Sequence, residues 1–204
     1  MDDPQSIPPP GPIRDGRAGS AMLAHAVDPT APDTITFARL IGAKAQSNEM
    51  LLLGLGRDEL SALIARHFPR GLSDTVLPTT MVWSPHRLFV SELCALLLQH
   101  DRTAATNPAD SRCLATIIAT ACLRPDHLWR DLGLSGRDDV TNIFERHYPD
   151  LIERNVNGLR WKKFLPQEVA LANGRAITFA PGCPGCEDFQ HCYPQDAIGP
   201  CATA

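Results

Sequence analysis

The chain has 204 residues, of which 44% are hydrophobic, and it carries a formal net charge of -4. This length can bury one good core, or at most two small lobes. The acidic balance argues against nucleic acid as a partner, because nucleic acid favours a basic protein surface.

Residues 1–32 are predicted to form a disordered N-terminal arm. They are crowded with Pro, Gly, Asp, Ser and Ala, and they show no sustained apolar period. The start, MDDPQSIPPPGPIRDG, has acid and proline where a secretory signal needs basic residues and an apolar run. No other run approaches about 18 apolar residues. We therefore expect a cytoplasmic protein with no membrane partner.

Residues 33–174 are predicted to form an all-α domain, because apolar residues recur at helical spacing and strand signals are nearly absent. The periodic positions are Phe37, Leu40 and Ile41; Leu60, Leu63, Ile64 and Phe68; Leu93, Leu96 and Leu97; and Leu114, Ile117, Ile118, Ala121 and Cys122. A further helical segment at 159–172 leads into the tail. Polar, Gly- and Pro-containing loops separate these segments, which favours a helical bundle.

An internal repeat supports this interpretation. Residues 56–69 read GRDELSALIARHFP and residues 136–149 read GRDDVTNIFERHYP, in the same helical phase throughout. Each copy follows an earlier helix, so the repeats span about 34–69 and about 110–149. The sequence therefore predicts two related helical hairpins packed against each other.

Residues 175–204 form a predicted cysteine-rich, irregular tail. Cys183, Cys186 and Cys192 stand at C-x2-C-x5-C, and Cys201 follows near the end. In a reducing compartment clustered cysteines indicate metal or redox roles rather than disulfides. Gly182, Gly185 and the prolines permit the tight turns that bring successive thiolates to one place. We therefore expect these thiols to bind one soft metal centre.

The residues alone leave the kind of centre open. An iron-sulfur cluster fits, and so does a zinc ion held in a closed tetrahedron with Cys201 or His191 as the fourth ligand. A redox dithiol of Cys183 and Cys186 is a third interpretation, but the strand-helix setting of thioredoxin-like proteins is missing. The remaining cysteines lie among Leu, Ile and Ala and are expected in the core: Cys94, Cys113 and Cys122.

Several basic and imidazole side chains are candidates for the metal surroundings. His67 and His147 stand at the last turn of the repeated helix, where an imidazole either caps carbonyls at the core edge or approaches the metal. His127, in RPDHLWRDLGL, is compatible with packing and with binding. A basic cluster before the cysteines is either a solvated helix face or an attraction for an oxyanion or a thiolate cluster. It comprises Arg160, Lys162 and Lys163.

These segments together resemble the NifQ family of nitrogen-fixation proteins. The likeness covers roughly residues 35–193 and is carried by ARHFP, CLRPDHLWRDLGL, RHYP, GLRWKKFL and the clustered cysteines. The resemblance implies a carrier of a molybdenum-iron-sulfur cluster that supplies molybdenum, taken up as molybdate, for the iron-molybdenum cofactor of nitrogenase. The partners it implies are the nitrogenase iron protein and the scaffold complex on which the cofactor matures.

Two positions depart from the family pattern. The family tail reads C-x4-C-x2-C-x5-C, and its first cysteine falls on Thr178, a poor ligand for a soft metal. Either Cys201 or His191 then replaces it, or three thiolates hold the cluster and leave one corner without a protein bond. Pro166 is the second departure, and it is expected to start or kink the last helix.

The expected class is a metallocluster carrier and not an enzyme. No nucleophile and base stand at a recognisable spacing, and no glycine-rich loop could cradle a phosphate. The rival class is a zinc-stabilised helical module for protein interactions.

Overall fold

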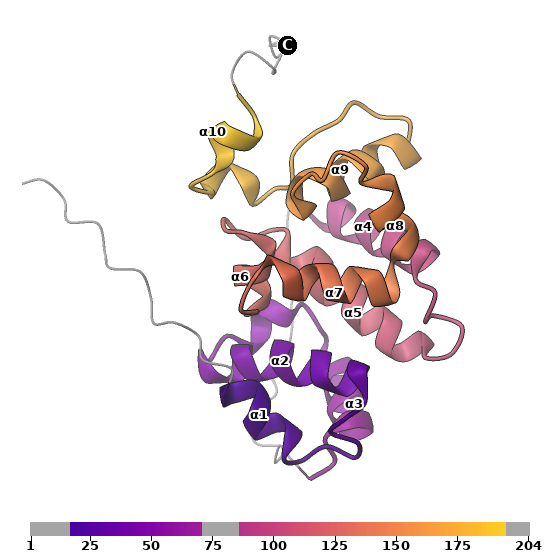
Figure 1. The fold of residues 1–204 in the computed structure, drawn as a ribbon, viewed down its shortest axis with the longest axis vertical. Helices are drawn as coiled ribbons and strands as arrows, with labels where there is room; N and C mark the ends of the chain where they lie inside the picture. The colour runs from indigo at the N-terminus through magenta and orange to yellow at the C-terminus, as the bar shows by residue number, and fades with distance from the viewer. Residues whose placement is uncertain (1–16, 71–85, 195–204) are drawn as a thin grey trace, which may run out of the picture.

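The structure is a computed structural model that describes residues 17–70 and 86–194 (Figure 1). Within these ranges the regular elements are all helices, which confirms the predicted all-α class. They are α1 (Arg17–Leu23), α2 (Pro32–Gln46), η1 (Met50–Leu53), α3 (Arg57–His67), α4 (Arg87–His100), α5 (Pro108–Ala121), α6 (Leu128–Leu132), α7 (Arg137–His147), α8 (Pro149–Arg154), α9 (Trp161–Ala172), η3 (Cys183–Gly185) and α10 (Phe189–Cys192). None of these helices combines the length and the apolar character that crossing a bilayer requires.

The sequence repeat is also a structural repeat. The first copy runs α2, η1, α3 and the second runs α5, α6, α7, so each predicted hairpin contains an additional short helical element. In both copies this short element ends at a glycine in the left-handed region, Gly54 with φ 73° and Gly133 with φ 75°. A Cβ on Gly54 would also lie 2.0 Å from Thr120 Oγ1. Glycine is therefore required there both by conformation and by space.

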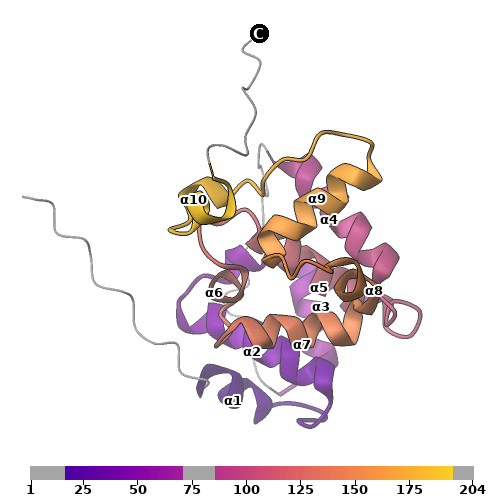
Figure 2. The same cartoon turned by 45° about the horizontal axis from the view of Figure 1, so that its top comes forward.

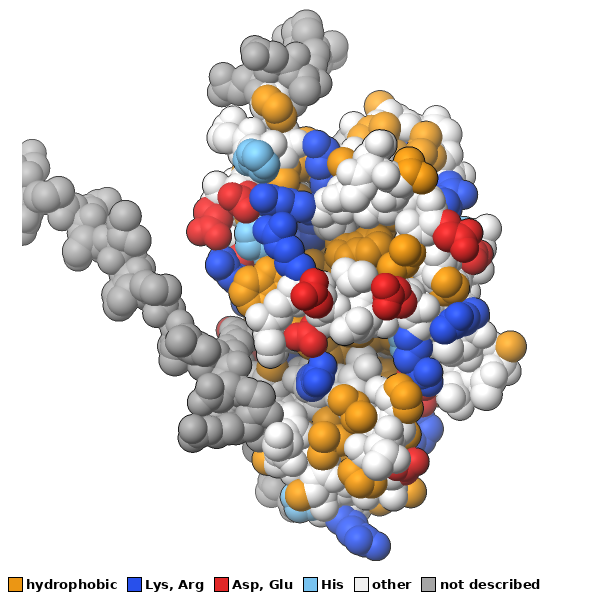
Figure 3. All heavy atoms as spheres, viewed as in Figure 1, with side chains coloured by type: hydrophobic (Ala, Val, Ile, Leu, Met, Phe, Trp, Pro, Cys, Tyr) orange, Lys and Arg blue, Asp and Glu red, His pale blue; other side chains and the backbone are white. Residues whose placement is uncertain are grey.

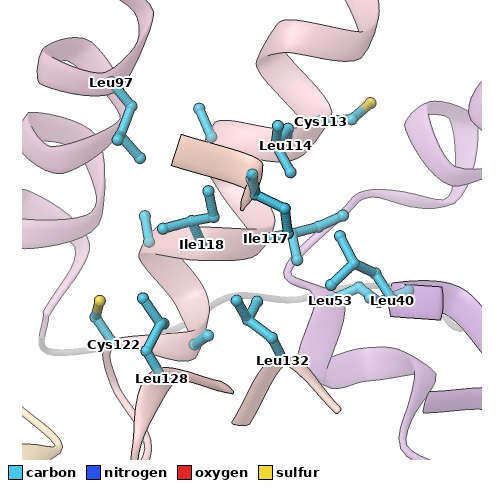
Figure 4. Close-up of a cluster of buried hydrophobic side chains, with 14 of the residues drawn as sticks. Leu40, Leu53, Leu97, Cys113, Leu114, Ile117, Ile118, Cys122, Leu128 and Leu132 are labelled. Carbon is cyan, nitrogen blue, oxygen red and sulfur yellow. The ribbon is translucent and has the colours of Figure 1, made fainter. Parts of the chain in front are cut away.

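Helix α5 lies at the centre of the molecule, in contact with α3, α4, α6 and η1 (Figure 2). Its side chains Ile117 and Ile118 lie between Leu97 of α4 and Leu53 of η1 (Figure 4). Of the three cysteines predicted in the core, two are buried and Cys94 packs against the core while partly exposed. The loop that follows α5 is therefore anchored to a central, well-buried helix.

Helix α1 corrects the predicted N-terminal arm in its second half. Residues 1–16 of that arm lie outside the described part of the chain, but residues 17–23 form a helix that packs on α2. Met22 is buried in this contact. A helix of seven residues is too short to be stable alone or to show a clear apolar period, so the packing against α2 stabilises it.

Two reciprocal clamps, each an aspartate of one repeat bound to an Arg-His pair of the other, join the repeats. In the first clamp Asp110 at the start of α5 accepts a hydrogen bond from Arg66 Nε (2.8 Å) and lies 3.0 Å from His67 Nε2. Thr34 Oγ1 lies 2.9 Å from His67 Nδ1. The helix dipoles favour an acid at a helix start and cations at a helix end. His67 therefore joins the repeats and lies outside the metal surroundings.

The second clamp repeats this arrangement with the roles exchanged. Asp33 at the start of α2 accepts a hydrogen bond from Arg146 Nε (2.6 Å) and lies 3.3 Å from His147 Nε2. His147 Nδ1 lies 2.9 Å from Thr103 Oγ1 and 3.7 Å from Asp101 Oδ1. Burial lowers the pKa of His147, but the nearby carboxylates of Asp101 and Asp33 outweigh it and the net shift is upward. Burial raises the pKa of Asp101, yet the nearby His147 and hydrogen bonds from Ser111 and Thr103 lower it to about 2.

The second clamp should make stability depend on pH. Because the folded pKa of His147 lies above its unfolded value of about 6.5, its contribution is complete below that pH and is lost as the pH rises through the folded pKa. The contribution of Asp101 is present above 3.8 and is lost as the pH falls towards about 2. We expect the urea-unfolding free energy of the wild type to decline from about pH 6.5 upward, and the variant His147→Gln to lack this decline. Parallel curves for the two proteins would contradict the assignment.

Candidate metal centre

The cysteine tail is docked on the loop between α5 and α6. The Gly182 N–H donates to Cys122 O at 3.1 Å. A Cβ on Gly182 would lie 1.9 Å from Arg124 O, and one on Gly185 would lie 2.5 Å from Pro125 Cβ. Gly182 has a φ of -80°, which any residue can adopt. Close approach of two chain segments, more than turn conformation, therefore requires glycine in the PGCPG segment.

The three predicted thiols line one cavity of about 200 Å³ between the tail, this loop and the start of α9. Figures 1 and 2 show α10 beside these segments at one edge of the bundle, and Figure 3 shows Lys and Arg side chains gathered at the same edge. Cys183 is buried, whereas Cys186 and Cys192 are partly exposed. The wall also carries basic and aromatic side chains: His127, Arg137, Arg160, Lys162, Lys163, Trp129, Trp161 and Tyr193.

Pro166 shapes the surroundings of Cys183. Of the two predicted effects, starting or kinking the helix, the first is wrong, because Pro166 lies inside α9 rather than at its start. Proline has no N–H, so the carbonyl of Lys162, four residues earlier, lacks its helical donor. The Cys183 thiol donates to that oxygen at 3.7 Å. Burial raises the pKa of Cys183, although the Lys162 charge opposes this. Metal binding must therefore displace a proton from this sulfur.

Lys162 is a buried structural residue as well as part of the pocket wall. Its side chain is 7% exposed and forms an ion pair with Asp131. Its ammonium also donates to Arg124 O at 2.9 Å and to Asp126 O at 2.6 Å. These bonds fix the loop that the tail is docked on, so Lys162 connects α9, the loop and the floor of the pocket.

Arg160 and Lys163 connect the start of α9 to the tail. Arg160 forms an ion pair with Asp188, and it also interacts with the Cys192 thiol. Lys163 donates to the Cys192 carbonyl and lies 5.2 Å from the ring centroid of Tyr193. Two of the three predicted basic residues therefore hold the segment that carries the third thiol.

The structure adds one basic residue that the sequence did not reveal. Arg137 is exposed at the start of α7 and lines the pocket. It lies far from the cysteines in the sequence, and only the folding of the second repeat brings it to the pocket. No local sequence signal marks it.

His127 is the predicted histidine that the structure places in the pocket. Its side chain is 12% exposed, and Nε2 lies 3.1 Å from Asp188 Oδ2 and 3.7 Å from Glu187 Oε1. Burial, and then the charge of Arg137, lower its pKa. His147 lies in the second clamp and does not line this pocket.

The candidates for a fourth ligand named from the tail do not reach the pocket within the described residues. His191 is exposed on α10 and does not line the cavity. Thr178, at the position of the family's first cysteine, is also exposed and outside the wall. Cys201 lies outside the described part of the chain.

Tyr193 gives a test of whether a sulfur-rich group fits. Its hydroxyl is buried and has no hydrogen-bond partner among the described residues. Burial, and then the nearby thiols of Cys183 and Cys192, raise its pKa, so the hydroxyl stays protonated. A buried donor beside two thiols fits a bound group that brings acceptor atoms such as sulfide.

The described residues also contain ligand atoms close enough to share a single ion. They belong to Asp126, His127 and Glu187 and lie within 4.8 Å of one another. The guanidinium of Arg130 already donates to Asp126 at 3.2 Å and to Glu187 at 2.9 Å. Its positive charge therefore takes the place that a metal ion would need between these two carboxylates. The three thiols do not form so close a group. To share one zinc ion, whose sulfur ligands lie about 3.8 Å apart, they would have to draw together.

Comparison with known proteins gives consistent relatives. A sequence model of the NifQ family matches residues 35–194. The chain is 34% identical over 147 residues to the protein NifQ homolog of Sinorhizobium fredii, covering 69% of this chain and 60% of that protein. It is 40% identical over 80 residues to the protein NifQ of Azotobacter vinelandii, and this match covers 39% of this chain and 41% of that protein. It is 29% identical over 145 residues to the protein NifQ of Rhodobacter capsulatus, and this match covers 71% of this chain and 77% of that protein.

The chain thus spans less than two thirds of the length of the first two relatives. No solved structure matches it. The family match nevertheless covers well over half of the chain, and it includes the repeats, the loop before α6 and all three thiols. The chain belongs to the NifQ family of nitrogen-fixation proteins.

Proposed function

We propose that this protein carries a molybdenum-iron-sulfur cluster and donates molybdenum for biosynthesis of the nitrogenase iron-molybdenum cofactor. The observation that carries the proposal is the arrangement of three thiols and several cationic side chains around one pocket. Thiolates are the ligands that iron-sulfur centres favour, and family membership supplies the setting of nitrogen fixation.

The residues of the pocket have separable roles in this proposal. Cys183, Cys186 and Cys192 bind the cluster, which is the cargo of the protein. The charge of Lys162 favours the thiolate form of Cys183 and so opposes the burial that raises its pKa. Tyr193 donates its hydroxyl hydrogen to an acceptor atom of the cargo.

The protein acts as a carrier and not as a catalyst in this proposal. Its partners are the nitrogenase iron protein and the scaffold complex on which the cofactor matures, and molybdate is the source of the metal. The docked tail lies at an edge of the bundle, where a partner can reach Cys186 and Cys192 because both are partly exposed (Figure 1).

Anaerobic metal analysis tests the proposal. We expect the full chain purified from molybdate-supplied cells to contain iron, acid-labile sulfide and molybdenum. Cys183→Ser, Cys186→Ser and Cys192→Ser should each lose most of the iron, since serine is a poor ligand for a soft centre. Cys94→Ser is the matched control and should keep it, because Cys94 does not line the pocket. A colourless protein with one zinc ion per chain would reject the proposal in favour of a zinc-stabilised interaction module.

A further inference from the structure

We propose that His127 is the fourth protein ligand of the cluster and binds through Nδ1 while Asp188 holds Nε2. This inference rests on the proposed function and adds to it a residue far from the cysteine motif in the sequence. It supplies a ligand in place of the family's first cysteine, at whose position this chain has Thr178.

The pocket wall offers few suitable donors. A soft or borderline metal binds thiolate sulfur or a neutral imidazole nitrogen, whereas protonated Lys and Arg have no lone pair to offer. Among the described residues of the wall, such donors are the three thiols and His127. The imidazole is largely shielded, with 12% of the side chain exposed.

Asp188 fixes the orientation of the imidazole. Asp188 Oδ2 lies 3.1 Å from Nε2, and because a carboxylate only accepts hydrogen bonds, this contact favours the tautomer with the hydrogen on Nε2. Nδ1 then holds the lone pair, and it has no partner among the described residues. Metal-bound histidines usually donate their other ring N–H to a carboxylate, which sets the tautomer and the ring orientation.

Arg160 in turn holds Asp188 through an ion pair. Asp188 lies between Cys186 and Cys192, so the segment that carries two of the thiols also carries the acid that orients His127. Docking of the tail therefore brings the thiols and the orienting acid to the pocket together. Three thiolates and a neutral imidazole carry one negative charge less than four thiolates would.

Pulsed electron paramagnetic resonance on the full chain tests the assignment. The wild type and three variants, His127→Ala, His127→Cys and His191→Ala, are prepared anaerobically with ¹⁵N-labelled histidine and compared with unlabelled protein. We expect labelled-histidine coupling to the paramagnetic cluster in the wild type and in His191→Ala, and its loss in both His127 variants. His127→Cys should keep the iron and sulfide content, because a thiolate replaces the imidazole.

The outcomes separate this inference from the proposed function. A wild type without iron and sulfide would reject the proposed function itself. A wild type with a cluster, but with histidine coupling that persists in His127→Cys or disappears in His191→Ala, would overturn the assignment of His127 alone.

The role of Asp188 has its own readout. In Asp188→Asn the amide holds the imidazole less well, so a chelator should remove iron about 10- to 100-fold faster, while the histidine coupling persists. An unchanged rate of iron loss would contradict the positioning role of Asp188.

Discussion

Gly182→Ala is expected to release the cysteine tail and to abolish most iron binding. The new Cβ would lie 1.9 Å from Arg124 O, 2.4 Å from Arg124 C and 2.6 Å from Arg124 N, so either the tail or the loop must move. The loop is held by Lys162, which donates to Arg124 O at 2.9 Å. The tail should therefore move, taking Cys183 away from the pocket. Limited proteolysis near residues 173–182 and the iron content measure this release.

Gly136→Ala is the matched control for that substitution. Gly136 has a φ of -168°, and a Cβ there would meet no atom within 4 Å. It should leave proteolysis and iron content unchanged. In Gly182→Ala the tail leaves but the core stays intact. The unfolding free energy of that variant should therefore fall by at most about 3 kcal/mol, the upper end of the usual cost of overpacking. Wild-type iron binding in Gly182→Ala would show that the loop yields instead.

Lys162→Met is expected to cost about 3 kcal/mol of the unfolding free energy. It leaves the buried carboxylate of Asp131 without its ammonium partner and leaves the carbonyls of Arg124 and Asp126 without a donor. Breaking a buried ion pair from one side costs about 3–5 kcal/mol. Arg124 Nε remains 3.1 Å from Asp131, which places the cost at the low end. Urea unfolding of the metal-free chain measures it.

Lys163→Met separates the structural role of Lys162 from a general loss of positive charge. Lys163 is partly exposed and donates to a single carbonyl, that of Cys192, so its replacement should cost about 1 kcal/mol. Adding Asp131→Asn to Lys162→Met should recover part of the lost stability, because it removes the unpaired charge. Equal losses for Lys162→Met and Lys163→Met would contradict the buried ion pair.

Local pattern was sufficient to predict the longer helices and the repeat, but not α1 or the short elements η1 and α6. Apolar positions such as Leu60, Leu63 and Ile64 recur with helical spacing and are buried together in the structure. The C-x2-C-x5-C spacing likewise predicted three thiols at one place, and they line one pocket. These features depend on residues that are close in the sequence, which is why a single sequence reveals them.

Features that depend on long-range pairing could not be predicted. His67 and His147 showed a repeated position, but nothing local identifies the acids Asp110 and Asp33 as their partners. The pattern of LRWKKFL also does not reveal that Lys162 is buried while Lys163 is partly exposed, because burial depends on where Asp131 lies in the fold. Gly182 was predicted to permit a turn, whereas its contact with Arg124 determines the need for glycine.

The exchange of partners in the two clamps bears on how this molecule can be divided. Each half holds the aspartate that neutralises the other half's arginine, as in an isologous contact between identical subunits. A fragment that contained one half alone would expose an acid and an Arg-His pair that cannot reach each other. The same ion pairs could re-form only between two copies of the fragment, so the covalent link between the halves takes the place of dimerisation.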